Sequence, residues 1–200
     1  MIKFALASFA ITIVSTLVVA IVFDNAAYLP SISEAGANMG YPIYSIGGTI
    51  SACLLFLGIS QFALQTTSSS SYLQCLTIIT TAIMCTAFIY QCIVKIDLAA
   101  SSCPHRTAAG IFFILSYIVS FFIALIDEQK TQRKTTLRIS CAITIVFLII
   151  LQGKIFDQWN NTNSVSKKTL DNDDIFITKF SLIQYALVFC LFLLLGSILI

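Results

Sequence analysis

The chain holds few residues that could do chemistry, and the clearest of them is its one histidine, His105. The nearest carboxylates on the same predicted side of the membrane are Glu34, in the stretch YLPSISEAGANMGYP (28–42), and Asp97, eight residues before the histidine. Histidine titrates near neutral pH, so a pair with either carboxylate could bind a lipid head group or respond to acidity. The alternative is an ordinary interfacial histidine at a helix start that follows Pro104.

These polar residues do not form a catalytic set. One histidine without a nucleophile or metal partners makes a poor active site, so we expect no catalytic residue, no metal and no cofactor. The seven cysteines show neither the CxxC nor the Cys/His spacing of a zinc site. Cys103 is predicted to lie in a loop. The others lie within apolar segments, where cysteine acts as a small apolar residue: Cys53, Cys75, Cys85, Cys92, Cys141 and Cys190.

Composition places most of the chain in a membrane. Of its 200 residues 58% are hydrophobic and 10% charged, the net charge is +2, and the mean hydropathy is +0.95. A soluble domain is about a quarter charged, and a soluble fold of this length could not bury so much apolar surface. No basic run indicates a nucleic-acid partner. We therefore expect one membrane domain, 1–200, whose partners are membrane lipids and not nucleic acid.

Six apolar segments are long enough, or nearly so, to cross a bilayer as helices. A crossing takes about 20 apolar residues, and the runs are continuous rather than alternating, which argues against barrel strands. The first could instead be a signal peptide, but it exceeds the usual apolar length of about 7–15 residues. The sequence predicts an all-α bundle of six transmembrane helices, at about 4–23, 43–64, 73–94, 107–126, 137–156 and 182–200.

The charged loops predict the orientation of the bundle. The loop DEQKTQRKTTLR (127–138) carries four basic residues, and cytoplasmic loops are enriched in Lys and Arg. This loop and both termini are therefore predicted to be cytoplasmic, while the first loop, His105 and 152–180 lie on the luminal or outer side. The last of these holds Asn160-Asn161-Thr162, the pattern of an N-glycosylation site at Asn160, although so short a pattern also arises by chance.

The interiors of the predicted spans carry no charged residue. The charges lie at span ends, within reach of the interface, among them Lys3, Lys95, Asp97, Arg106 and Arg138. This disfavours an ion-coupled transporter, a proton pump or a voltage sensor. The second and third spans hold only mildly polar residues, which we expect to serve helix packing, with a groove for a lipid head group as the alternative. Gly47, Gly48 and Ser51 are expected near one side of their helix.

Two motifs together resemble a known family. PSISEAG (30–36) resembles the first-loop signature P-x-I-S-[D/E]-x-G of the Frag/DRAM/Sfk superfamily, and HRTAAGIFF, from His105, resembles the family's start of the fourth span. The likeness covers the whole six-span topology and is sharp over some twenty residues. The chain departs from the family at NMGYP, where an acidic residue is often found, and at Gln184-Tyr185, where many members have an acidic–aromatic pair.

The resemblance implies a function that the residues alone do not. It indicates a non-enzymatic DRAM-like protein that modulates autophagy or the organisation of lysosomal and other membrane lipids, in an endolysosomal or plasma membrane. The alternative is a factor of the ER or Golgi that remodels the lipid of GPI anchors, and a small transporter or channel subunit is a third class. The expected binding or structural site is Pro30, Ile32, Ser33, Glu34, Gly36, Asp97 and His105.

The first loop is expected to be a fixed turn. Pro30 and Gly36 favour a defined conformation, and Ser33 and Glu34 are placed to cap a short helix. We expect the loop to fold over the luminal end of the bundle, to approach His105 and to shape a luminal vestibule, or to act as a purely structural lid. A carboxylate beside His105 would favour its protonated form.

Overall fold

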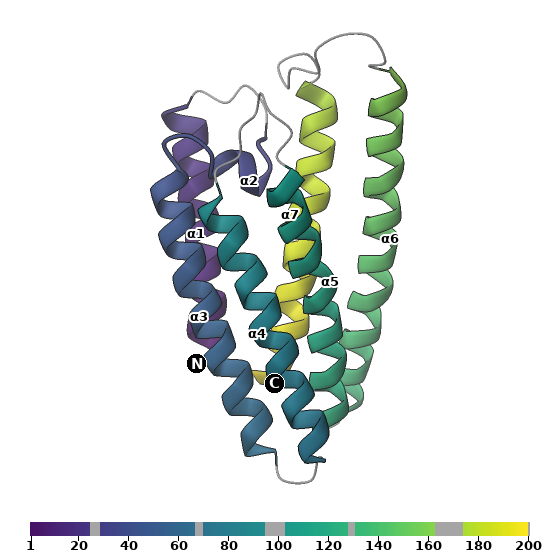
Figure 1. Cartoon of the computed structure of the whole chain (residues 1–200). Helices are drawn as coiled ribbons and strands as arrows, with labels where there is room; N and C mark the ends of the chain where they lie inside the picture. Colours follow the sequence, from purple (N-terminus) through teal and green to yellow (C-terminus); the bar gives the residue numbers. More distant parts are fainter. Residues whose placement is uncertain (25–28, 67–69, 95–102, 128–130, 163–173, 200) are drawn as a thin grey trace.

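The structure, a computed structural model, confirms an all-α fold (Figure 1). It describes residues 1–24, 29–66, 70–94, 103–127, 131–162 and 174–199, without the side chains of 33, 103, 106, 156–162 and 174–177. These residues form helices and no strand, and six of the helices are long and apolar enough to cross a membrane. The elements are α1 (Ile2–Val22), α2 (Ile32–Ala35), α3 (Tyr41–Gln65), α4 (Ser71–Ile93), α5 (Cys103–Ile126), α6 (Gln132–Thr162), α7 (Asp174–Gly196) and the 3-10 helix η2 (Ser197–Leu199).

The sixth helix of the chain, α6, is longer than its apolar stretch. It has 31 residues, whereas the sequence predicted a span over 137–156. The prediction followed hydropathy alone, but the flanking Gln132, Arg133 and Lys134 are good helix formers, and the helix continues through them. At its other end α6 runs through Asn160 to Thr162. The glycosylation pattern therefore lies in the last turn of a helix and not in a loop.

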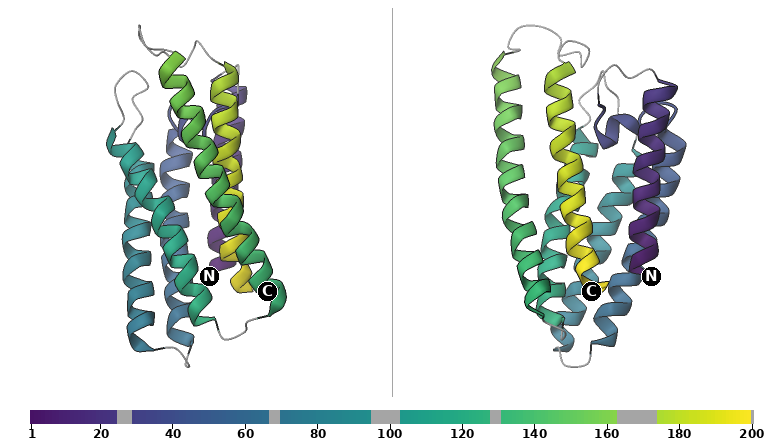
Figure 2. Two further views of the ribbon diagram at one scale, coloured as in Figure 1. Left: turned by 90° about the vertical axis from the view of Figure 1, so that its right-hand side faces the viewer. Right: turned by 180° about the vertical axis from the view of Figure 1, so that it is seen from behind.

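Five long helices form a ring, and the sixth packs outside it. In chain order α1 packs against α3, α3 against α4 and α4 against α5, while α7 contacts both α1 and α5 and so closes the ring. Helix α6 packs against α7 at the edge of the bundle (Figure 2). Both termini lie toward one end, here called the terminus end, and α2 lies at the other, here called the loop end (Figure 1).

Aromatic side chains fill the centre of the ring. Phe88 of α4 stacks on Phe112 of α5 with ring centroids 4.5 Å apart, and it forms an edge-to-face pair with Phe9 of α1, with centroids 4.9 Å apart. Phe9 also contacts Phe192 of α7, at 5.3 Å. Such pairs contribute about 0.5–1.5 kcal/mol each beyond their buried area. Four helices are thus joined across the axis of the bundle by one aromatic cluster.

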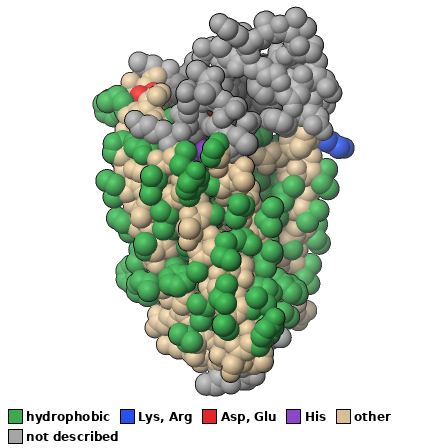
Figure 3. All heavy atoms as spheres, in the orientation of Figure 1, with side chains coloured by type: hydrophobic (Ala, Val, Ile, Leu, Met, Phe, Trp, Pro, Cys, Tyr) green, Lys and Arg blue, Asp and Glu red, His purple; other side chains and the backbone are tan. Residues whose placement is uncertain are grey.

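The outer surface is mostly apolar. Hydrophobic side chains spread over the face shown in Figure 3, and charged ones show only toward its upper edge. Many large apolar side chains are more than half exposed, among them Ile114, Ile143 and Phe147. A soluble monomer rarely exposes so much contiguous apolar surface. This surface therefore fits a multi-pass protein whose spans face lipid.

Glycines of α3 allow close approach on two sides of the helix. A Cβ at Gly47 would overlap the Thr12 side chain of α1, and a Cβ at Gly48 would overlap Cys92 of α4. The prediction that Gly47, Gly48 and Ser51 serve one side is therefore wrong for Gly48. Neighbouring residues on a helix differ by about 100°, which is enough for Gly47 and Gly48 to face different neighbours.

Hydroxyl groups in the spans bond mostly within their own helix. Thr16, Thr77 and Thr81 donate to the carbonyl four residues earlier, which a helical hydroxyl can always reach. A hydroxyl contact between helices joins α1 and α3, where Ser51 Oγ lies 2.9 Å from Ser8 Oγ.

Candidate functional site

The stretch PSISEAG folds into a capped single turn, α2. Ser31 Oγ accepts a hydrogen bond from the Glu34 amide at 3.2 Å, and Glu34 Oε2 accepts one from the Ser31 amide at 2.7 Å. This reciprocal pair is a capping box, which satisfies two donors at the helix start. The sequence predicted Ser33 in this role. Ser31 takes it because it stands three residues before Glu34, and the Ser33 side chain lies outside the described part of the chain.

The capped turn is docked on the bundle by residues of the same motif. The Tyr185 hydroxyl of α7 donates to the Pro30 carbonyl at 3.1 Å. Ile32 is buried in the main core at 8% exposure. A Cβ at Gly36 would overlap the ring of Tyr44 in α3. The motif therefore has a structural explanation at these three positions, and Gly36 is needed because the Tyr44 ring packs directly against its Cα.

Tyr44 carries the contact from the first loop onward to α4. Its side chain is buried, and its hydroxyl oxygen accepts a hydrogen bond from Gln91 Nε2 at 3.1 Å. The Gln91 Oε1 atom is also buried and has no hydrogen-bond partner among the described residues. Nearby, the Tyr41 hydroxyl donates to the Ile93 carbonyl at 2.7 Å. The start of α3 is thus tied to the end of α4 by two tyrosines.

His105 lies at the start of α5 and is 3% exposed. Its Nδ1 is 3.3 Å from the Val94 carbonyl oxygen, an acceptor, so Nδ1 carries the proton and donates. Burial lowers the pKa of His105 from its ordinary 6.5, and bonds to the Val94 and Gln91 carbonyls oppose part of this shift. A neighbouring carboxylate would raise the pKa instead. The net direction is therefore the opposite of the one expected for a histidine–carboxylate pair.

The two sequence motifs are linked through intermediate side chains. Contacts run from Gly36 to Tyr44, from Tyr44 to Gln91, and from the Gln91 backbone to His105. We call Pro30, Gly36, Tyr44, Gln91, His105 and Tyr185 the loop-end network. Sequence reasoning did not find Tyr44 or Gln91, because nothing local marks a buried Tyr and Gln that meet across two helices.

Two of the predicted site residues cannot be added to this network. Asp97 lies outside the described residues, so its pairing with His105 stays a prediction. Asn160 is in helix α6, and its side chain is likewise not described. Glycosylation at this position also stays a prediction.

The chemistry available in the network is hydrogen bonding. The buried Gln91 Oε1 can accept a bond, and the neutral His105 ring holds its Nδ1 proton on a carbonyl. No cluster of three or more His, Cys, Asp or Glu side chains suited to a metal occurs in the described part of the chain. Within that part, Cys53 and Cys75 are exposed free thiols, and Cys85, Cys92, Cys141 and Cys190 are buried ones.

A second polar cluster, at the terminus end, was missed by the sequence reasoning. Asp127 Oδ2 accepts hydrogen bonds from Arg138 Nη2 at 2.7 Å and from Lys134 Nζ at 3.4 Å. Arg138 Nε also donates to Ser197 Oγ at 2.9 Å. These four residues form the terminus-end ion cluster. The sequence indicated only that this loop is basic, and the signal for a buried pair was the position of Asp127, which directly follows a long apolar run.

The chain was compared with family models, with curated proteins and with solved structures, and nothing matches it. Membership of the Frag/DRAM/Sfk superfamily is therefore a proposal that depends on the motifs.

Proposed function

We propose that this protein is a non-enzymatic DRAM-like membrane protein that modulates autophagy or membrane-lipid organisation. We place it in an endolysosomal or plasma membrane. One observation carries the proposal: residues of the first-loop motif dock the loop on the bundle, and the docked loop connects to the second motif through Tyr44 and Gln91. Two stretches that resemble one family thus belong to one network.

The packing of the bundle supports a role in binding or organising over a role in conduction. Phe9, Phe88, Phe112 and Phe192 meet across the ring of helices. A path along the axis would have to displace this cluster, and buried aromatic side chains are costly to move. Together with spans whose interiors lack charge, this disfavours the transporter or channel alternative.

The proposal is tested by deleting the gene in its native cell and restoring it with variants. Autophagic flux, the lipid composition of GPI anchors and the organelle that holds the protein are measured together. Changed flux with unchanged anchors, in an endolysosomal or plasma-membrane protein, supports the proposal. Changed anchor lipids in an ER or Golgi protein would replace it with the remodelling function. No change in flux, anchors or total membrane lipids would refute both.

A matched pair of variants tests whether the loop-end network is responsible. Tyr185→Phe removes only the hydroxyl that holds Pro30, whereas Tyr72→Phe makes the same change on a tyrosine that is 76% exposed at the terminus end of α4. We expect Tyr185→Phe to restore function less well than Tyr72→Phe at equal protein level. Equal restoration would assign the network a purely structural role.

A further inference from the structure

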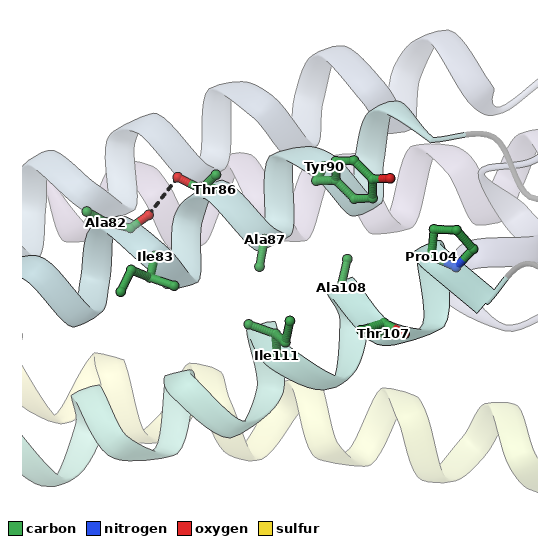
Figure 4. A pocket seen from close by; sticks show the side chains of 9 residues that line it. All are labelled: Ala82, Ile83, Thr86, Ala87, Tyr90, Pro104, Thr107, Ala108 and Ile111. Carbon is green, nitrogen blue, oxygen red and sulfur yellow. Dashed lines mark hydrogen bonds between the residues drawn. The ribbon is translucent and has the colours of Figure 1, made fainter.

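A groove lies on the outer side of the bundle, between α4 and α5. Its volume is about 670 Å³. Figure 4 shows Ala87 of α4 facing Ala108 and Ile111 of α5 across it, with Ile83 further along. The small side chains of Ala87 and Ala108 leave space between the two packed helices at this level. Because the spans face lipid, whatever fills the groove comes from the bilayer or is another helix.

The polarity of the groove selects an apolar occupant. None of its lining residues is charged. The Thr86 hydroxyl is bonded to the Ala82 carbonyl of its own helix at 2.9 Å, as the dashed line in Figure 4 shows. A polar ligand would find little to bond with along the base and would lose its own hydration. A neutral hydrocarbon chain complements this lining.

The length of the groove along the helices is close to the thickness of one leaflet of a bilayer. It extends along α4 from Ala82 to Tyr90, and with a rise of 1.5 Å for each step between residues this is about 12 Å. The hydrocarbon core of a bilayer is about 30 Å thick, so each leaflet contributes about half. Tyr90 is three residues from the end of α4, and Pro104 is the second residue of α5. Both mark the mouth of the groove at the interface, where tyrosine is enriched.

A partner helix fits this shape less well. A transmembrane helix is about 10–12 Å across with its side chains and would contact the spans along their whole length. Past the groove, toward the terminus end, the next turns of α4 and α5 carry Ile79 and Ile114, which are 52% and 61% exposed. These large side chains replace the small ones at the base of the groove. The hollow is thus confined to the half of the membrane at the loop end.

We propose that this groove binds one acyl chain of a phospholipid from the leaflet at the loop end. The chain would enter beside Tyr90 and Pro104 and reach toward Ala82 and Ile111. Tyr90 and Pro104 directly precede Gln91 and His105 in the sequence, so the lipid head group would lie beside the loop-end network. The inference requires that the spans cross a bilayer, and it does not rest on the proposed cellular function.

Photo-crosslinking in vesicles tests the proposal directly. The full chain is placed in phosphatidylcholine vesicles that contain a fraction of phosphatidylcholine with a diazirine on one chain, either near the head group or near the methyl end. We expect the first probe to label the protein around Tyr90 and Pro104, and the second around Ala82 and Ile111. Uniform labelling along the lipid-facing sides of α4, α5 and α6 with both probes would overturn the proposal.

A variant that fills the groove gives an independent measurement. Ala108→Leu adds bulk at the base, and Ala142→Leu makes the same change on an exposed position of α6. We expect Ala108→Leu to reduce groove labelling to the level found on α6, and Ala142→Leu to leave it unchanged. Retained labelling in a folded Ala108→Leu protein would contradict the proposal. Crosslinks between two copies at cysteines placed at Thr86 would show that a helix fills the groove instead, and would overturn it.

Discussion

Arg138 holds Asp127 in a buried ion pair at the terminus end of the bundle. Arg138 Nη2 lies 2.7 Å from Asp127 Oδ2, and the two side chains are 12% and 5% exposed. Lys134, whose side chain is 2% exposed, donates to the same oxygen. Asp127 directly follows the end of α5, and Arg138 lies in the second turn of α6 and also reaches Ser197 of η2. The cluster therefore fixes the peripheral helix α6 to the ring.

Breaking this pair from one side should strongly destabilise the protein. Asp127→Asn leaves two buried cations without a counter-charge, and loss of one partner of a buried pair costs about 3–5 kcal/mol. We expect a clear fall in the melting temperature in detergent. Arg133→Gln is the matched control, because Arg133 is exposed on the same helix turn and an exposed charge contributes about 0–1 kcal/mol. Equal melting temperatures for the two variants would show that the pair is not formed.

The packing of α3 against α4 should depend on Gly48. Gly48→Ala places a methyl group against Cys92, and overpacking of this kind costs about 1–3 kcal/mol. The matched control is Gly110→Ala, whose added Cβ would have nothing within 4 Å. There the helix-propensity gain of about 0.5–1 kcal/mol should dominate. Thermal unfolding of both variants measures the difference, and an unchanged melting temperature in Gly48→Ala would mean that the helices adjust freely.

Local patterns predicted the helices and most of the first loop. Continuous apolar runs determined the six spans, since a bilayer requires that length and composition. The spacing of Ser31 and Glu34, behind Pro30, contains a complete capping signal. The prediction chose Ser33, although only Ser31 stands at the required distance.

The contacts between helices were not predictable from local patterns. Tyr185 and Pro30 are 155 positions apart, and Arg138 and Ser197 are 59 apart. Such pairs depend on the order of the helices around the ring. The hydrophobic pattern within one helix does not show which other helices lie next to it. The same holds for Gly47 and Gly48, which differ by one position and face different neighbours.

The orientation of the bundle is a separate prediction. The basic loop 127–138 is expected to be cytoplasmic and the segment 152–180 luminal or external, and residues 163–173 of that segment lie outside the described part of the chain. A labelling cysteine for the loop 127–138 is placed at the exposed Gln132. Thr131 is avoided because its hydroxyl accepts a hydrogen bond from the Lys134 amide at the start of α6. A membrane-impermeant maleimide should reach Gln132→Cys only from the cytoplasmic side, and Ser166→Cys only from the other. The wild-type chain measures labelling of native cysteines, and the reverse pattern would invert the topology.

Acidification should destabilise the fold through His105. Burial lowers its pKa in the folded protein below 6.5, its ordinary value. As the pH falls below 6.5, the unfolded chain therefore binds a proton more readily than the folded one. The folding stability falls together with the pH until the pH is below the pKa of the folded state. Well above pH 6.5 the His105 ring is neutral in both the folded and the unfolded state, so it contributes no pH dependence to the stability. Since His105 is the only histidine, no other side chain of ordinary pKa titrates between about pH 5 and 8.

The variant His105→Gln isolates this contribution. Glutamine can still donate to the Val94 carbonyl that Nδ1 contacts, but it does not titrate. We expect the melting temperature of the wild type to fall between pH 7.5 and 5.5 and that of His105→Gln to change less over the same range. Two parallel curves would mean that the folded protein protonates His105 as easily as the unfolded chain does. A wild type that becomes more stable at low pH would mean that a carboxylate, such as Asp97, stabilises the charged ring.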